Sequence, residues 1–353
     1  MKFLRFLLFP FAVLFGIVVF LRNKFYDWHF ISSSRFDIPI IVVGNISTGG
    51  TGKSPHIEYL IRLLRNDFKV STLSRGYGRH TEGFILSDVT TSAKDIGDEP
   101  KQFKNKFNEI AVAVDAKRAN GIKQLLNQVE GLQVILLDDA FQHRAVKSGL
   151  SILLTDYSKL YCDDYLLPVG NLREFSKGAK RADIIIVTKC PVQLSNEERN
   201  KLIGRINPNS FQTVYFSFIK YGELIRLNGN KEKEQTDYLS KQYDLLLLTG
   251  IANTKPLEEY LIDKVKLVAN VKFSDHHQFS ADDLLDVIKK FNTIASEKKI
   301  ILTTEKDAMR LLDSDFKELL VDLPLFYLPI EIQFHNDDQT NFNKQIINYV
   351  RQN

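Results

Sequence analysis

The sequence GNISTGGTGKSP occupies residues 44–55 and follows an apolar run at residues 38–43. The strict phosphate-loop pattern G-x-x-x-x-G-K-[ST] requires glycine where this chain has Ser47, so a flexible glycine turn is the alternative interpretation. The context favours the phosphate loop, because the preceding run is typical of a buried strand. The amphipathic segment HIEYLIRLLR (56–65) that follows is typical of a helix. We therefore predict a nucleotide site at this loop.

The loop supplies the chemical groups that a triphosphate needs. Its glycines let the backbone turn N–H groups inward, and Lys53 provides a cation for the β and γ phosphates. Ser54 places a hydroxyl where Mg²⁺ is held, and a helix that begins near Pro55 directs its positive end at the anion. The predicted cofactor contacts are Thr48, Gly49, Gly50, Thr51, Gly52, Lys53 and Ser54.

Two carboxylates end the strand-like segment QVILLDD (133–139). Asp138 and Asp139 match the arrangement of a Walker B element, whose acid holds or orients Mg²⁺. A helix cap is the alternative use of such acids. The pattern does not indicate which of the two aspartates binds Mg²⁺ and which orients it.

The segment VTKCP (187–191) bears on the choice of nucleotide. It approaches the Asn/Thr-Lys-x-Asp pattern of proteins that read guanine, but no acidic residue completes it after Cys190. The carboxylate that would bind the edge of guanine is therefore missing. We expect ATP.

Composition bounds the class of protein. The 353 residues are 44% hydrophobic and 25% charged, which is ordinary for a folded chain of two domains. Basic residues exceed acidic ones by only 47 − 43 = 4, so we expect no nucleic-acid partner. Cys162 and Cys190 lack metal-type spacing, which argues against a disulfide framework and fits a reducing compartment.

Apolar strand-like segments alternate with helical stretches in the first part of the chain. This alternation predicts an α/β fold with a P-loop NTPase-like parallel sheet, whose ligands bind beyond the carboxyl ends of the strands. The candidate strands are residues 38–43, 68–73, 110–114, 133–137, 150–154 and 183–188.

The rest of the chain predicts a second, smaller α/β domain. Alternation of apolar and polar residues about Tyr221 and Gly222 is typical of an antiparallel ribbon, and the strand–loop–helix pattern restarts at YDLLLLTG (243–250). The expected divisions are an N-terminal anchor helix at 1–24, a P-loop domain at 25–211, a ribbon and linker at 212–239, and the smaller domain at 240–353.

The N-terminus is apolar. Sixteen uncharged residues (22 − 5 − 1) separate Arg5 from Arg22, and as a helix they extend about 24 Å, against roughly 30 Å for a hydrocarbon core. Both a crossing and a helix buried in one leaflet are feasible. A cleaved signal peptide is the alternative, but the next residues, RNKFYDWHF (22–30), contain no small-residue cleavage site. We expect a retained membrane anchor with an aromatic interfacial segment.

Several further segments, in order along the chain, give a specific resemblance. They are VVGNISTGGTGKSP (42–55), LSRGYGR (73–79), GDEP (97–100), VDAKRANG (114–121), LDDAFQHR (137–144), LLPVGNLREF (166–175), LLTGIANTKP (247–256), FSDHHQF (273–279) and TTEKDAMRL (303–311). With the apolar start, this set resembles the tetraacyldisaccharide 4'-kinases of lipid A synthesis. The chain departs from the family pattern at Phe175, where proline is common, and at Ser54, where threonine is common.

The resemblance implies an enzyme anchored at the cytoplasmic face of a bacterial inner membrane. Its cofactors would be ATP and Mg²⁺. It would transfer the γ-phosphate of ATP to the 4'-hydroxyl of an acylated glucosamine disaccharide 1-phosphate at the lipid surface.

The resemblance also implies catalytic residues. Asp98 in GDEP would be the base that accepts the hydroxyl proton, and His276, from the second domain, would pair with it while Lys53 binds phosphate. We prefer His276 to His277 because the family's Asp-His pair is matched at Asp275-His276. Without the resemblance, Asp98 could equally cap a helix, and the two histidines could be surface residues.

Substrate recognition calls for donors to phosphate and sugar. Arg75, Tyr77 and Arg79 interleave forked guanidinium groups with an aromatic ring, although a solvent-facing basic turn is the alternative. Second-rank candidates are Arg118, Gln142, His143, Arg144 and Arg173. Lys306 and Asp307 lie in a matched segment without an assigned role.

Two other functions compete. A membrane-associated regulatory ATPase of the partitioning type has a similar loop, but it usually carries lysine where this chain has Thr48, and it lacks GDEP and the Asp-His-His segment. A nucleotide-binding module without catalysis would not need to retain Asp98 beside the complete loop. We therefore expect a kinase.

Overall fold

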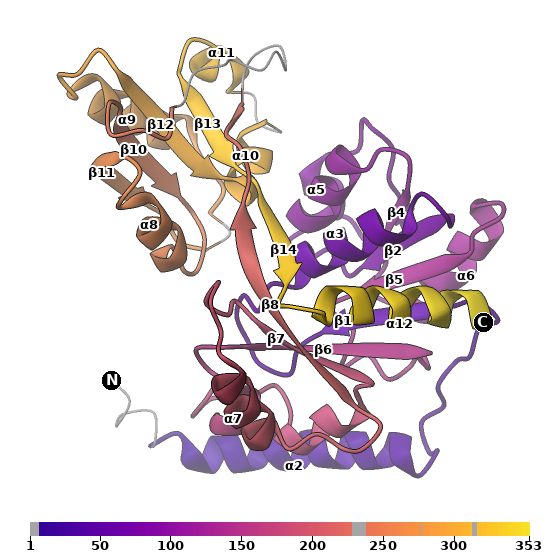
Figure 1. Cartoon of the computed structure of the whole chain (residues 1–353). Helices are drawn as coiled ribbons and strands as arrows, with labels where there is room; N and C mark the ends of the chain where they lie inside the picture. The colour runs from indigo at the N-terminus through magenta and orange to yellow at the C-terminus, as the bar shows by residue number, and fades with distance from the viewer. Residues whose placement is uncertain (1–6, 228–237, 276, 313–315) are drawn as a thin grey trace.

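The structure is a computed structural model that describes residues 7–227, 238–275, 277–312 and 316–353. Within these residues the larger body is built on a nine-stranded sheet with the order β14-β8-β7-β6-β1-β5-β2-β4-β3 (Figure 1). Its strands are β1 (Ile40–Gly44), β2 (Val70–Ser74), β3 (Ile85–Leu86), β4 (Ala111–Val114), β5 (Val134–Asp138), β6 (Leu150–Asp156), β7 (Ile184–Thr188), β8 (Thr213–Tyr221) and β14 (Ile330–Phe334).

Strand β1 lies inside this sheet because all its side chains can be buried. Ile40 and Val42 enter one hydrophobic core while Ile41 and Val43 enter the other, since successive side chains of a strand point to opposite faces. β1 pairs in parallel with β5 on one side and β6 on the other. Continuous burial is typical of a parallel sheet covered on both faces, so the predicted α/β fold is confirmed.

Helices cover both faces of the large sheet. Apolar residues of α3 (Lys53–Leu64), α5 (Asp98–Lys106) and α12 (Asp338–Gln352) fill the core on one face. Those of α6 (Arg118–Gln128) and α7 (Asn196–Ile206) fill the core on the other. The short α4 (Ala93–Ile96) precedes α5, and the 3₁₀ turns η1 (Tyr161–Asp163) and η2 (Ser176–Arg181) lie between β6 and β7.

The smaller body is a separate five-stranded sheet in the described residues, with the order β11-β10-β12-β13-β9 (Figure 1). Three of its neighbouring pairs are parallel, and β9 adds an antiparallel edge. Its elements are β9 (Ile225–Arg226), β10 (Asp244–Thr249), α8 (Lys255–Leu261), β11 (Lys266–Lys272), α9 (Ala281–Asn292), β12 (Lys299–Thr304), α10 (Glu305–Leu312), α11 (Lys317–Leu320) and β13 (Leu325–Leu328).

The chain leaves the larger body through β8 and returns to it through β14. These two strands pair antiparallel with each other, with Tyr221 opposite Ile330, and β8 pairs in parallel with β7. The structure therefore departs from the expected ribbon about Tyr221 and Gly222, because β8 finds its antiparallel partner in β14 and β9 joins the smaller sheet. It also departs from a smaller domain running to residue 353, because β14 and α12 pack on the large sheet.

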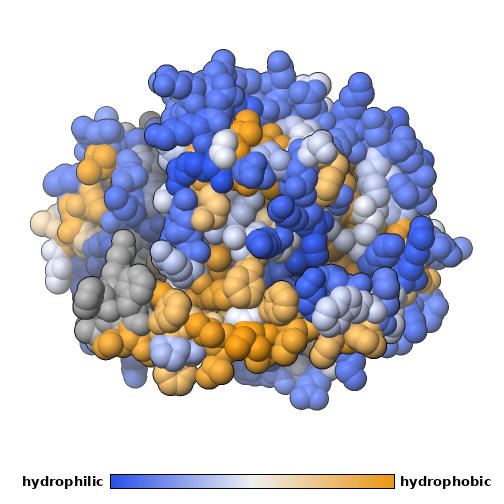
Figure 2. Space-filling model, turned by 90° about the horizontal axis from the view of Figure 1, so that it is seen from below, coloured by the Kyte–Doolittle hydropathy of each residue, from blue (hydrophilic) through white to orange (hydrophobic). Residues whose placement is uncertain are grey.

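Helix α2 (Phe9–Asp27) lies along the underside of the larger body (Figure 1). Its Ala12, Gly16 and Val19 form one buried row, whereas most of its other large apolar side chains are exposed. A Cβ atom on Gly16 would lie 2.9 Å from Leu166 and 3.0 Å from Phe175, so the helix fits closely there. Figure 2 shows a band of hydrophobic residues across this face. Among the described residues, α2 is the one helix that is long and apolar enough to cross a membrane.

Candidate active site

The phosphate loop connects β1 to α3 at the carboxyl edge of the large sheet. Gly49 and Gly52 have left-handed backbone conformations, with φ of 105° and 87°, which glycine adopts without a steric penalty. The Asn45 side-chain amide donates a hydrogen bond to the Thr51 hydroxyl over 2.7 Å and so braces the loop from within. The strand, loop and helix thus have the arrangement that the sequence predicted, with Lys53 as the first residue of α3.

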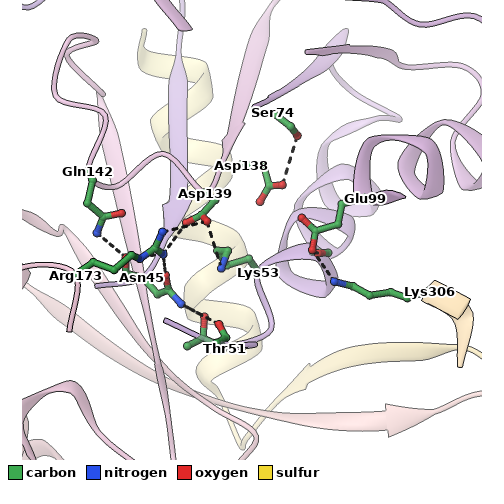
Figure 3. Close-up of polar contacts among 12 residues, drawn as sticks. Asn45, Thr51, Lys53, Ser74, Glu99, Asp138, Asp139, Gln142, Arg173 and Lys306 are labelled. Atoms are coloured by element: carbon green, nitrogen blue, oxygen red, sulfur yellow. Dashed lines mark hydrogen bonds and ion pairs between the residues drawn. The ribbon is translucent and has the colours of Figure 1, made fainter. Parts of the chain in front are cut away.

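Lys53 faces the carboxylate of Asp139, which lies just after the end of β5 (Figure 3). Their charged atoms are 3.5 Å apart. The guanidinium of Arg173 donates to the same carboxylate over 2.9 Å and also to Asn45. Asp139 has a φ of 43°, an uncommon value for a non-glycine residue that turns the chain at the strand end. The structure therefore brings together Lys53, Asp139 and Arg173.

Asp138 lies deeper, with 2% of its surface exposed. One carboxylate oxygen accepts a long hydrogen bond of 3.4 Å from Ser74, and the other has no hydrogen-bond partner among the described residues. Burial, together with the negative charges of Glu99 and Asp139, raises the pKa of Asp138 to about 7. A cation near this oxygen would remove the penalty of burying an unpaired carboxylate.

Ser54 has a partner from another helix. Its hydroxyl donates to Glu99 over 2.9 Å, and the same carboxylate oxygen accepts from Lys306 over 2.6 Å (Figure 3). Burial acts to raise the pKa of Glu99, but the charge and hydrogen bond of Lys306 outweigh it and lower the pKa to about 2. Glu99 therefore stays ionised between the phosphate-loop hydroxyl and a lysine of the smaller body.

Divalent-ion chemistry fits this donor set. Ser54 offers a hydroxyl, and Asp138 offers a carboxylate oxygen that no described residue contacts by a hydrogen bond. Mg²⁺ prefers such hard oxygen donors. No group of three His, Cys, Asp or Glu side chains in the described part of the chain is arranged to hold a metal ion by itself. A bound Mg²⁺ would therefore take its other ligands from phosphate oxygens and water, as is usual for this ion.

Asp98 is the first residue of α5, one position before Glu99. The Arg310 side chain of the smaller body donates to its carboxylate over 2.8 Å and to Asp307 over 2.9 Å. Gly97 precedes it with a φ of 91°, and a Cβ atom there would lie 2.8 Å from the carbonyl oxygen of Tyr77. The helix terminus thus packs directly on the turn of the predicted substrate segment.

His276 lies outside the described residues. Its neighbour His277 contacts the Asp283 carboxylate over 2.9 Å and stacks on Phe273, at a ring-centroid distance of 4.4 Å. These contacts give His277 partners within the smaller body. The preference for His276 over His277 as the catalytic histidine therefore stays a prediction.

The predicted substrate residues separate into three groups. Gln142 and Arg173 reach Asn45 beside the phosphate loop, and Arg118 is buried against the backbone carbonyls of Asp115 and Asp138. Arg144 instead contacts α2, where it donates to Asp27 over 2.8 Å. The third group follows β2: Arg75 and Tyr77 are exposed, and Arg79 is half-buried. The half-buried His143 has its pKa lowered to about 4 by burial and by the charges of Arg118, Arg22 and Arg75.

Sequence reasoning missed four residues that complete this arrangement. They are Asn45, Glu99, Glu174 and Arg310. Glu174 accepts hydrogen bonds from Gln142 and Arg181. All four lie inside segments that carried the family resemblance. Glu99 and Glu174 are adjacent to Asp98 and Arg173, which the sequence analysis named, so the available signal for these two was a charged residue beside a named one.

A parallel sheet, a glycine-rich strand-to-helix loop with its lysine, and aspartates at the end of the adjacent strand define the class of P-loop nucleotide-binding proteins. Within this class, the family model "Tetraacyldisaccharide-1-P 4'-kinase" matches residues 4–351. The chain belongs to this family.

Full-length relatives agree. The tetraacyldisaccharide 4'-kinase of Flavobacterium johnsoniae is 48% identical over 353 residues, which cover 100% of this chain and 99% of the relative. That of Bacteroides fragilis strain YCH46 is 45% identical over 355 residues, covering 98% and 93%. A crystal structure described as LpxK from Aquifex aeolicus in complex with ATP has a TM-score of 0.75 at 27% identity, covering 98% of this chain and 99% of that chain.

Proposed function

We propose that this chain, a tetraacyldisaccharide 4'-kinase of lipid A biosynthesis by family, transfers the γ-phosphate of ATP to the 4'-hydroxyl of an acylated glucosamine disaccharide 1-phosphate. The 4'-oxygen forms a bond to the γ-phosphorus while the bond to the β–γ bridging oxygen breaks. ADP then leaves, and the hydroxyl proton passes to a base. The ATP complex of the Aquifex aeolicus relative supports ATP as the donor.

One observation carries the proposal. The Ser54 hydroxyl of the phosphate loop donates to Glu99, the residue next to Asp98 at the start of α5. The helix that begins with the candidate base thus contacts the phosphate loop through its second residue. Phosphoryl transfer depends mainly on such alignment and on charge neutralisation, because the acceptor hydroxyl is a weak nucleophile.

The phosphate loop would bind the donor. Its backbone amides and the N-terminus of α3 suit the phosphate oxygens, and Lys53 would neutralise charge on the β and γ phosphates. Mg²⁺ would be held by Ser54 and Asp138, with Asp139 orienting its surroundings. When bound, the ion would offset the negative charge of the triphosphate.

Asp98 would accept the proton of the 4'-hydroxyl. It begins α5, contacts Arg310 of the smaller body and precedes Glu99, which contacts the phosphate loop. We propose His276 as its partner, on the family pattern alone. Arg75, Tyr77 and Arg79 follow β2, and the Tyr77 carbonyl oxygen lies beside Gly97, so these three residues are our first candidates for contacts to the acylated sugar.

The substrate is a lipid, so the site must lie near a membrane. Helix α2 presents one buried row to the protein and a wide apolar face outward, which suits a helix lying in one leaflet better than a crossing. Trp28 and Phe30, exposed after the helix, suit the headgroup layer. We therefore propose attachment to the cytoplasmic face of the inner membrane, where ATP is available.

The test is transfer of label to lipid. Purified protein with labelled ATP, Mg²⁺ and the acylated disaccharide 1-phosphate should give labelled lipid, and Asp98→Asn should reduce the turnover number by about 10²- to 10⁴-fold, as expected for loss of a general base. Asp286→Asn, which removes an exposed carboxylate of α9, is the matched control and should leave turnover unchanged.

Three outcomes would overturn parts of the proposal. ATP hydrolysis without labelled lipid would favour a regulatory ATPase. Near-normal turnover of Asp98→Asn would remove Asp98 from the role of base. Equal loss in Asp98→Asn and Asp286→Asn would mean that the assay reports stability rather than catalysis.

A further inference from the structure

Lys106, the last residue of α5, lies between two buried carboxylates of other helices. Its ammonium is 2.7 Å from Glu58 of the phosphate-loop helix α3 and 2.6 Å from Glu305 of α10 in the smaller body. The side chains of Glu58 and Glu305 are only 1% and 6% exposed. One lysine thus joins three helices that belong to both bodies (Figure 1).

The surroundings of Glu58 fix its position. Its carboxylate also accepts from Gln102 of α5 over 2.6 Å and from Arg62 of α3 over 3.2 Å. Glu58 is therefore part of the larger body whether or not the smaller body is docked. Glu305 approaches this network from the smaller body, and Lys106 is the cation between the two carboxylates.

Helix α10 contacts both ends of α5. At the start of α5, Lys306 and Arg310 contact Glu99 and Asp98, as described above. At its end, Glu305 contacts Lys106, and Met309 accepts a hydrogen bond of 3.4 Å from Asn105. The start of α5 and its last turn are about 12 Å apart, as follows from the helical rise. Contacts at both ends fix the direction of α5 as well as its position.

Electrostatics make the lysine decisive for this contact. Two carboxylates in a poorly solvated environment repel each other strongly, and an uncompensated buried charge costs far more than an exposed one. With Lys106 present, Glu305 can approach Glu58. Without it, Glu58 keeps its ion pair with Arg62, whereas Glu305 loses the ammonium that it contacts, so the docking of α10 on α3 and α5 is weakened.

We propose that Lys106 is a positioning residue for phosphoryl transfer: it holds α10 against α3 and α5, and so fixes Asp98 relative to the phosphate loop. This inference rests on the proposed function for the role of Asp98. Lys106 itself is at the far end of α5 from Asp98 and takes no part in the chemistry.

The experiment compares Lys106→Met with Lys104→Met in the full-length protein. Lys104 lies on the same helix, but its ammonium contacts the backbone carbonyls of Asn108 and Ile110, so its loss leaves no carboxylate unpaired. Hydrogen exchange of the α10 and α5 amides measures docking, and steady-state kinetics with the acylated disaccharide measures transfer.

Lys106→Met should speed amide exchange in α10 by about tenfold or more and lower the turnover number by a similar factor. The KM for ATP should stay within about threefold of wild type, because the phosphate loop is intact. Lys104→Met should resemble wild type. Adding Glu305→Gln to Lys106→Met should restore most of the turnover, since it removes the repelling charge; a general loss of fold would not be rescued in this way.

Several results would overturn the inference. Unchanged amide exchange in α10 of Lys106→Met would show that Lys106 does not hold α10 in place. Faster exchange with normal turnover would show that the docking of α10 does not affect catalysis. Failure of Glu305→Gln to rescue would exclude carboxylate repulsion. If Lys106→Met fails to fold, Lys106→Gln is used, with the same expectations. The exchange measurement needs no substrate, so it decides the docking claim even if the proposed kinase reaction fails.

Discussion

Arg310 and Asp98 are separated by 212 positions in the chain, yet the guanidinium Nε of the first lies 2.8 Å from a carboxylate oxygen of the second. The same guanidinium donates to Asp307 and to the carbonyl oxygen of Gly250, over 2.9 and 3.1 Å. With 2% of its side chain exposed, Arg310 is a buried cation that joins the smaller sheet to the candidate base.

Replacement of Arg310 by alanine should therefore lower both stability and activity. Asp307, whose side chain is fully buried, would lose its cation, and breaking such a pair from one side costs about 3–5 kcal/mol. Urea unfolding measures the free energy, and lipid labelling measures the turnover number. Arg351→Ala, at an exposed position near the C-terminus, should change neither. An Arg310→Ala protein as stable as wild type would contradict the importance of this ion pair.

Lys53→Ala should strongly reduce phosphate transfer while the fold survives. The ammonium is the cation that the loop directs at the phosphates, and loss of one such electrostatic contact typically costs about 10²–10³ in the turnover number. Circular dichroism and thermal melting check the fold, and labelled ATP checks transfer. Lys94→Ala, an exposed lysine on α4, serves as control. Turnover above a tenth of wild type would argue that another cation neutralises the phosphates.

His56 should make stability fall in acid. It is buried in α3, its ring nitrogens contact the Gly52 carbonyl oxygen and the Ser217 hydroxyl, and burial lowers its pKa from 6.5 to about 4. In the unfolded chain the imidazole gains its proton near pH 6.5, whereas the folded state resists protonation until about pH 4. The stabilisation is therefore complete above pH 6.5 and is lost between pH 6.5 and 4, by about 3 kcal/mol in total.

Urea unfolding at pH 7.5 and pH 5 measures this contribution. His56→Gln can keep a hydrogen bond without a proton to gain, so its stability should change less over the same interval. Carboxylates that titrate in the same interval, such as Asp138, are common to both proteins, so the difference between the two pH profiles isolates the histidine. Equal pH profiles for wild type and His56→Gln would exclude His56 as the source.

The outer face of α2 should control membrane attachment. Leu14 and Val18 are 61% and 66% exposed and lie one turn apart, so Leu14→Glu/Val18→Glu places two charges on the proposed lipid face. Binding to vesicles that contain anionic lipid should fall about tenfold or more, with an unchanged melting temperature. Deletion of residues 1–22 should have at least the same effect on binding.

The inner face of α2 supplies the matched control. Gly16→Val adds a Cβ atom 2.9 Å from Leu166 and 3.0 Å from Phe175, closer than van der Waals contact, so it should lower the melting temperature while vesicle binding persists. Unchanged partition after either the double substitution or the deletion would contradict a role for α2 as the anchor.

Short sequence patterns predicted the parts of the site whose residues are close together in the chain. The phosphate loop needs only a strand, a glycine-rich turn and a helix in sequence, and Asp138 and Asp139 follow directly from a strand end. The ATP site and the family followed from these segments taken together.

Pairings over long distances could not be predicted in this way. The contacts of Glu99 with Lys306 and of Lys106 with Glu305 depend on how two sheets pack, and they leave no periodicity in the sequence. The return of β14 to the large sheet was missed for the same reason. Phe175, where the resemblance led us to expect proline, lies beside Gly16 of α2, an element far from it in the chain.

The return of the chain through β14 and α12 has a consequence for synthesis on the ribosome. Tyr349 of α12 accepts a hydrogen bond from the backbone of Ile40, at the start of the strand that leads into the phosphate loop. In the nascent polypeptide, the apolar sheet face that α12 covers therefore stays exposed until α12 is made, whereas α2 is made much earlier. The unfinished enzyme is expected to meet the bilayer before it is able to retain nucleotide.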